Sequence, residues 1–224
     1  MLSVYHGTDN PDFEPVYNGS GEYNDYGSGL YCTEDIALAR EWACKFQGRK
    51  TGYVFSYGVF LDELNVLRLT PPDYNVLNWL ALIVKHRTSP SWSAIVRRRA
   101  RQFVEKCAPD IDGSDVIFGY RADDSYFAFA RDFLNVALTV GQLSRAFSLG
   151  DLGSQVALKS RRAFSRACLK PMGVETIASP DYNEYYRTYI ERDARARKML
   201  NDVRQSLYGD GRTILDILAE GVSG

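Results

Sequence analysis

Hydrophobic residues along this chain fall into short continuous runs and into longer stretches with helical spacing. Short apolar runs bounded by turn-forming residues predict strands, and they lie at 2–5, 30–32, 52–61, 64–69, 114–119 and 154–159. Apolar residues at helical spacing predict helices at 33–46, 74–86, 125–140, 143–149 and 213–219, with one more starting near Arg162. The basic stretch at 91–106 is also expected to be helical, and the strongly charged stretch at 179–208 predicts a long surface helix with i, i+4 ion pairs. Because strands and helices do not alternate strictly, the pattern predicts an α+β fold rather than a doubly wound parallel sheet.

Capping signals set the expected ends of two of these helices. Thr33 stands just before the first helical stretch and is the expected N-cap, with Gly48 as the stop after about Phe46. Ser160 is the expected cap of the helix that starts near Arg162.

The bulk charge of the chain excludes a strong general attraction to nucleic acid or to anionic membranes. The 224 residues include 27 Lys plus Arg and 28 Asp plus Glu, which gives a formal net charge of -1. One basic run stands out, from Arg97 to Arg101. Two interpretations stay open: the run forms a solvated helix face, or it is a positively charged site that binds a phosphate-bearing target.

Cysteine and histidine usage predicts no metal site. The four cysteines (32, 44, 107 and 168) form no C-x-x-C pair, and the chain has only two histidines, so no zinc-binding spacing is present. The start of the chain has no basic stretch followed by an apolar run, and the longest apolar stretch, at 76–84, is far too short to cross a bilayer. We therefore expect a cytoplasmic protein with free thiols and no membrane partner, while a secreted effector without a classical signal stays open.

Three separated motifs carry the candidate chemistry. They are Val4-Tyr5-His6-Gly7-Thr8, Tyr26-Gly27-Ser28-Gly29-Leu30-Tyr31-Cys32-Thr33 and Ser154-Gln155-Val156-Ala157-Leu158. Together with segments 115–119 and 122–124, they resemble a bacterial family, formerly of unknown function, that is placed in the ADP-ribosyltransferase superfamily near its His-Tyr-Glu branch. The resemblance is densest over 4–60 and 115–165 and weak over the basic run. Neither G-x-G-x-x-G nor a Walker A sequence is present, so any use of NAD⁺ must come from a non-Rossmann site.

The resemblance implies an ADP-ribosyltransferase-like split β-sheet cleft that holds NAD⁺ and is surrounded by helices. It implies an NAD-binding domain at 1–170, with the basic helical insert at about 88–110, and a helical extension at 171–224 packed on the same domain. His6 matches the position that hydrogen-bonds the adenosine-side ribose, and Tyr31 matches the aromatic residue that stacks on nicotinamide. Gln155 stands where the superfamily has its catalytic Glu.

Further residues complete the expected site. Gly7 would let the backbone approach the dinucleotide closely, and Thr8 would bond the same sugar or an adenine edge. The remaining expected NAD⁺-binding residues are Tyr5, Gly29 and Thr33. Because Gln155 carries no charge, Asp123 and Asp124 are candidates for the anionic group that would offset the cation developing on the ribose. The alternative for both aspartates is capping of the helix that follows them.

The activity that the resemblance implies is mono-ADP-ribosyl transfer from NAD⁺ to a macromolecule, with release of nicotinamide. NAD⁺ would be a co-substrate, and no metal is expected. The acceptor class, protein or nucleic acid, stays open. Such activities suit toxins of toxin–antitoxin or phage-defence systems, which would add a cognate antitoxin as a partner. The alternatives are an NAD⁺ glycohydrolase, with water as acceptor, and a catalytically weak NAD⁺-binding pseudoenzyme, which the neutral Gln155 would favour.

Overall fold

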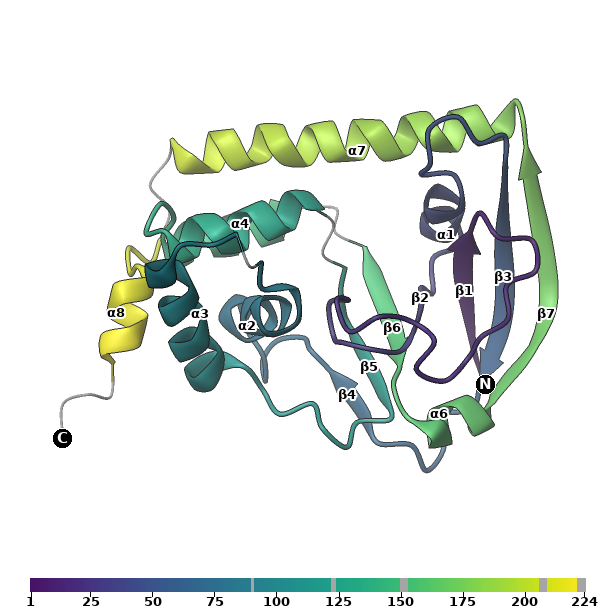
Figure 1. The fold of residues 1–224 in the computed structure, drawn as a ribbon, viewed down its shortest axis with the longest axis horizontal. Helices are drawn as coiled ribbons and strands as arrows, with labels where there is room; N and C mark the ends of the chain where they lie inside the picture. Colours follow the sequence, from purple (N-terminus) through teal and green to yellow (C-terminus); the bar gives the residue numbers. More distant parts are fainter. Residues whose placement is uncertain (90, 122–123, 150–152, 206–208, 221–224) are drawn as a thin grey trace.

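The computed structural model describes residues 1–89, 91–121, 124–149, 153–205 and 209–220, and these form an α+β fold built on two sheets (Figure 1). The first sheet has the strand order β1-β3-β7, with both pairings antiparallel. Its strands are β1 (Leu2–Thr8), β3 (Thr51–Val59) and β7 (Ala167–Ala178). The first strand therefore continues through the His6-Gly7-Thr8 motif, which the apolar run alone placed at the strand's end.

The second sheet has the order β2-β6-β5-β4, in which only the β4–β5 pairing is parallel. Its strands are β2 (Leu30–Cys32), β6 (Ser154–Leu158), β5 (Val116–Tyr120) and β4 (Val66–Arg68). An isolated antiparallel bridge joins the two sheets, because Tyr5 N donates to Thr33 O at 2.8 Å and Thr33 N donates to Tyr5 O at 2.9 Å. This bridge sets β1 beside β2.

Helices cover the outer faces of both sheets (Figure 1). They are α1 (Ile36–Ala43), α2 (Val76–Arg87), α3 (Ala94–Cys107), α4 (Asp124–Leu134), α5 (Val140–Leu149), α6 (Arg161–Arg166), α7 (Asp181–Arg204) and α8 (Ile214–Ala219). In Figure 1, α1 lies against β1 and β3, and α7 runs across the top of the molecule from the first sheet to the helices beside the second.

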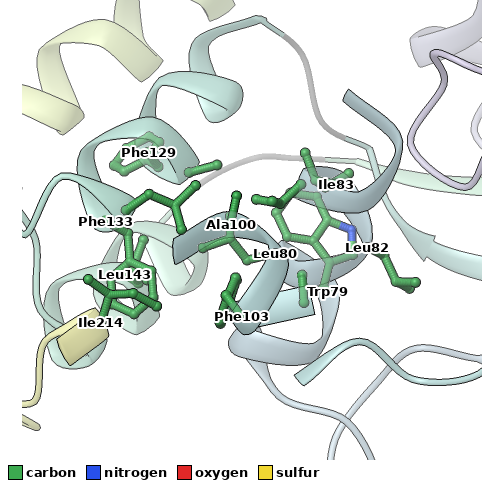
Figure 2. Close-up of a cluster of buried hydrophobic side chains, with 14 of the residues drawn as sticks. Trp79, Leu80, Leu82, Ile83, Ala100, Phe103, Phe129, Phe133, Leu143 and Ile214 are labelled. Carbon is green, nitrogen blue, oxygen red and sulfur yellow. The ribbon is translucent and has the colours of Figure 1, made fainter. Parts of the chain in front are cut away.

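Strand alternation in the second sheet separates two clusters of the hydrophobic core. In β5, Val116 and Phe118 face the first sheet, whereas Ile117 between them packs into the helical cluster. Figure 2 shows that cluster, which includes Trp79, Leu80, Leu82, Ile83, Ala100, Phe103, Phe129, Phe133, Leu143 and Ile214. The second sheet is therefore held between the first sheet on one face and helices on the other.

The basic stretch forms helix α3, and its two faces differ. Val96, Ala100 and Phe103 are buried in the helical cluster, while Arg97, Arg98 and Arg101 are exposed. The helix is thus an integral part of the core, because its apolar stripe packs on neighbouring helices. Within the described residues, none of the helices combines the length and apolar character that a bilayer-spanning segment requires.

The structure corrects two helix predictions. Asp35, not Thr33, caps α1: its Oδ1 accepts from Ala37 N at 2.8 Å, while the Thr33 hydroxyl accepts from Asp35 N. The helix expected at 125–140 ends at Leu134, and Val136 adopts a positive φ of 66°, which a continuous helix cannot accommodate.

Strand β7 was missed, and it crosses the domain boundary expected at residue 170. It forms the edge of the first sheet, and its exposed apolar residues (Met172 and Val174) give no alternation of buried and polar positions. The helical extension therefore begins at Asp181, after the sheet is complete. It packs on α1 through a buried ion pair, in which Arg192 Nε and Nη2 each lie 2.9 Å from a Glu41 carboxylate oxygen.

Candidate functional site

A cavity of about 560 Å³ opens where the two sheets meet, and His6, Tyr31 and Gln155 all line it. Its volume is within the range of ligand pockets in enzymes. The three residues come from β1, β2 and β6, three strands that lie side by side in Figure 1. Tyr31 pairs with Ala157, and Gln155 is two positions from Ala157, so strand alternation places Tyr31 and Gln155 on the same face of the second sheet.

His6 is held as a neutral imidazole. Its Nδ1 lies 2.7 Å from Tyr31 O, and since a carbonyl oxygen can only accept, Nδ1 donates and Nε2 is the acceptor. Burial lowers the pKa of His6 and Lys45 lowers it further, against the opposing effect of the Tyr31 carbonyl. The ring stacks on Phe13 with centroids 4.2 Å apart. The site thus presents a positioned, uncharged histidine at neutral pH.

Tyr31 contributes its ring rather than an acid or base. Its hydroxyl donates to Gly27 O at 2.6 Å and accepts from Tyr26 N at 3.0 Å. Burial is the main cause that raises the pKa of Tyr31 far above its ordinary value, so the phenol stays protonated. Its ring also stacks on that of Tyr26, with centroids 6.4 Å apart.

Gln155 lies beside a buried carboxylate that sequence reasoning missed. The side chain of Gln155 is 3% exposed, and its Nε2 donates to Asp25 Oδ2 at 2.8 Å and to Tyr120 O at 3.0 Å. Asp25 is 6% exposed and also lines the cavity, and its Oδ1 lies 3.3 Å from Arg87 Nη1. Asp25 stands in a stretch rich in Gly, Asn and Asp before β2, where an acidic residue is unremarkable.

A polar network beneath the cavity fixes the loop that carries Asp25. The fully buried Tyr26 donates its hydroxyl to Tyr120 O at 2.7 Å, and Trp79 Nε1 donates to Tyr26 Oη at 3.1 Å. Gly119 makes room for this ring, because a β-carbon at position 119 would lie 3.0 Å from Tyr26 Cζ and still closer to its hydroxyl oxygen. Second-layer contacts of this kind hold a first layer of functional groups in place.

Both glycines of the expected site line the cavity, but their missing side chains face other parts of the protein. A β-carbon at position 7 would lie 2.8 Å from Ala43 N and closer to Ala39 O, so Gly7 allows α1 to approach β1. A β-carbon at Gly29 would lie 2.8 Å from Leu158 O. The missing side chain of Gly7 therefore makes room for α1, and the expected close approach of the Gly7 backbone to a ligand stays a prediction.

Three residues expected to bind NAD⁺ are not among the described residues that line the cavity: Tyr5, Thr8 and Thr33. The backbone of Tyr5 bridges the sheets, and its ring packs against a cluster that includes Ala39 and Tyr182. The Thr8 hydroxyl accepts from Asn10 N at 3.2 Å, and Thr33 is fully buried. Tyr5 directly precedes His6 in β1, so its side chain points to the opposite face of the sheet, which a linear motif does not reveal.

The aspartates proposed to supply charge are not placed at the site. Asp123 lies outside the described residues, and Asp124 opens α4, where only its backbone is described. Their proposed role stays a prediction. Across the described part of the chain, no group of three or more His, Cys, Asp or Glu residues is arranged to hold a metal ion.

Basic and aromatic side chains that the motifs did not include complete the cavity wall. Lys45, Arg87 and Arg121 line it together with Trp42 and Tyr189. The Arg121 guanidinium lies 5.2 Å from the Trp42 ring centroid, within cation–π range. Trp42 is 8% exposed, and its Nε1 has no hydrogen-bond partner among the described residues. The wall thus combines positive charge, flat rings and one unused donor.

Comparison with known proteins identifies the family but no function. A search of curated proteins and a search of solved structures return no match. The model of the family described as "Protein of unknown function (DUF3990)" matches residues 2–170. That range contains β1, β2 and β6 with their cavity residues, while Tyr189 of α7 lies beyond it. The chain belongs to the DUF3990 family.

Proposed function

We propose that this protein is a mono-ADP-ribosyltransferase that binds NAD⁺ in the cavity between the sheets. The observation that carries the proposal is the meeting of His6, Tyr31 and Gln155 in one cavity. They stand 25 and 124 positions apart in the chain, and their order matches that of the His-Tyr-Glu pattern. The arrangement of two sheets joined by a bridge at β1 and β2 is also what a split-sheet NAD⁺ cleft would have.

The chemistry of the wall suits each part of a dinucleotide. The neutral His6 can accept a hydrogen bond from a ribose hydroxyl at Nε2. The ring of Tyr31 offers a π face to the cationic nicotinamide, which gains cation–π attraction while its charge persists. Lys45 and Arg121 supply positive charge for a diphosphate, for which Arg is geometrically well suited, while Arg87 lies against Asp25.

The reaction breaks the bond between nicotinamide and ribose C1′. The electron pair of that bond leaves with nicotinamide, which becomes neutral, and the ribose develops oxocarbenium character. An acceptor nucleophile then forms the new bond to C1′ and loses its proton to solvent. The amide oxygen of the buried Gln155 would accept from a ribose hydroxyl, because both of its N–H groups are donated to Asp25 and Tyr120 O, but the amide cannot offset the positive charge.

The neutral amide of Gln155 also supports a second candidate, an NAD⁺-binding pseudoenzyme. Measured NAD⁺ binding without nicotinamide release in any cell extract would support the pseudoenzyme. Release of nicotinamide without any macromolecular acceptor would instead select a glycohydrolase.

Labelled NAD⁺ incubated with the protein and whole-cell extract tests the proposal. We expect label on a macromolecule, nicotinamide release and NAD⁺ binding by calorimetry, all lost in His6→Ala and Tyr31→Ala. Sensitivity of the labelled product to nuclease or protease then identifies the acceptor class. Lys45→Ala should weaken NAD⁺ binding, whereas the exposed Lys50, which does not line the cavity, provides a matched control as Lys50→Ala. Absence of both binding and release in the wild type would refute the proposal.

The proposed biological setting is an intracellular toxin with a cognate antitoxin. Expression of the wild type in a bacterial host should then arrest growth, and His6→Ala should relieve the arrest at equal protein level. Equal toxicity of the wild type and His6→Ala would show that growth arrest does not depend on the cavity.

A further inference from the structure

The proposed reaction leaves one requirement unmet by Gln155. The ribose becomes positively charged as nicotinamide leaves, and an anion fixed beside it lowers the barrier more than it stabilises the ground state. An amide carries a dipole but no net charge. Among the described residues that line the cavity, the carboxylates are Glu14, which is exposed in a loop, and Asp25, which is buried.

Building on the proposed function, we propose that Asp25 is the catalytic carboxylate, and that Gln155 positions it. The two side chains form one unit, because Gln155 Nε2 donates to Asp25 Oδ2 at 2.8 Å. The negative charge therefore lies within one hydrogen bond of the strand position that holds Glu in the superfamily pattern. A chain can move a catalytic charge from a strand to a facing loop when the two positions meet in space.

The surroundings of Asp25 keep its charge in a fixed place. The next residue, Tyr26, is fully buried, and its backbone N donates to the hydroxyl of Tyr31. The Tyr26 hydroxyl is bound to Tyr120 O, which also accepts from Gln155 Nε2. Asp25 is thus tied to both Tyr31 and Gln155. A charge held in advance in a water-poor site costs no reorganisation when the transition state forms.

The alternative is that Asp25 has only a structural role, as the ion-pair partner of Arg87, and this alternative can be tested. Arg87 Nη1 lies 3.3 Å from Asp25 Oδ1, and the Arg87 guanidinium also lies 5.4 Å from the Phe127 ring centroid. A carboxylate that served only as a partner of Arg87 would matter for folding and not for turnover. A catalytic carboxylate would matter for turnover while the fold and NAD⁺ affinity persist.

In the step itself, Asp25 stays ionised and forms no covalent bond. The C1′–N bond breaks, its electron pair goes to nicotinamide, and the positive charge on the ribose is stabilised by the Asp25 carboxylate. The oxygen or nitrogen of the acceptor forms the new bond to C1′, and its proton passes to solvent. Asp25 therefore acts through its charge, and Gln155 acts through Asp25.

The first test is Asp25→Asn, which keeps the shape of the side chain and an oxygen that can accept from Gln155. We expect kcat for nicotinamide release to fall by about 10²–10³-fold, the usual loss for one preorganised electrostatic group. The Kd for NAD⁺ by calorimetry should stay within a few-fold. Asp12→Asn is the matched control, because Asp12 is exposed in the same loop region and does not line the cavity.

The second test moves the charge back to the strand. The double variant Asp25→Asn/Gln155→Glu keeps one carboxylate at the same pair of positions and should recover at least tenfold over Asp25→Asn. This variant also decides the case if Asp25→Asn alone fails to fold, because its carboxylate remains near Arg87. A folded double variant without turnover would overturn the proposal.

The outcomes separate this inference from the proposed function. A wild type that neither binds NAD⁺ nor releases nicotinamide refutes the proposed function itself. An active wild type with an equally active Asp25→Asn, or with an equal loss in Glu14→Gln, overturns only the role of Asp25. A wild type that binds NAD⁺ without turnover also overturns it, because the carboxylate then supplies no catalysis.

Discussion

The packing of β1 against α1 makes Gly7 the most sensitive glycine beside the cavity. A β-carbon at position 7 would lie 2.8 Å from Ala43 N and 3.0 Å from Ala39 C, with Ala39 O nearer still. Non-bonded heavy atoms settle at about 3.5 Å or more, so α1 would have to retreat by about 0.7 Å or further. Neither element yields easily, because Ala39 and Ala43 are fully buried and β1 pairs with β3 along its whole length.

The cost of Gly7→Ala follows from that geometry. One extra methyl group in a well-packed core destabilises by about 1–3 kcal/mol. We expect about 3 kcal/mol or more here, because the clashing atoms belong to a helix backbone and not to a flexible side chain. For a chain of this length, each kcal/mol lowers Tm by about 2–4 °C, so the expected loss is about 6–12 °C.

Thermal unfolding followed by circular dichroism measures this loss. Gly173→Ala is the matched control: Gly173 also lies in a strand of the first sheet, and a β-carbon there would meet no atom within 4 Å. That control should be neutral or slightly stabilising, by up to about 1 kcal/mol. If Gly7→Ala lowers Tm no more than Gly173→Ala does, the packing argument is wrong.

Three further predictions concern stability and reactivity. Arg192→Met leaves Glu41 buried without its ion-pair partner and should cost about 3–5 kcal/mol in urea unfolding, whereas Arg197→Met, which removes an exposed pair, should cost less than about 1 kcal/mol. Burial, with help from nearby lysines, lowers the pKa of His86 from 6.5 to about 4, so the unfolded chain takes up a proton first and stability falls as pH drops from 6.5 towards 4. Because solvent screens this partly exposed ring, His86→Gln should lose about 1 kcal/mol less than the wild type between pH 7 and 5, and equal losses would contradict the assignment. Cys32 is fully buried and burial raises the pKa of its thiol, so maleimide labelling followed by mass spectrometry should modify it only after denaturation.

Local sequence signals were sufficient to predict an element when its hydrophobic spacing and its capping or turn residues both lie within that element. The apolar runs at 30–32 and 154–159 correspond to β2 and β6, and Ser160 caps α6 by accepting from Ala163 N. The helix expected at 91–106 is α3, at Ala94–Cys107. These elements follow their local pattern because burial and side-chain spacing coincide along each one.

Elements defined by a distant partner gave no such signal. Strand β7 is exposed at the sheet edge and contains Pro171 and Gly173, which read as a break, and only its pairing with β3 makes it a strand. The cap of α1 was misplaced by two residues because Thr33 and Asp35 are both residue types that are favoured at an N-cap. What decides between them is that Thr33 is held in the bridge to Tyr5.

The same division runs through the candidate site. The sequence by itself was enough to single out His6, Tyr31 and Gln155 as candidate site residues, because each stands in a recognisable local motif. Only the tertiary structure decided that they share one cavity, and that Asp25 and Tyr189 join them. Strand pairing and helix packing bring together positions more than a hundred residues apart, and no local spacing encodes that distance. The charge beside the Gln155 amide therefore became visible only once the loop before β2 was seen to fold onto β6.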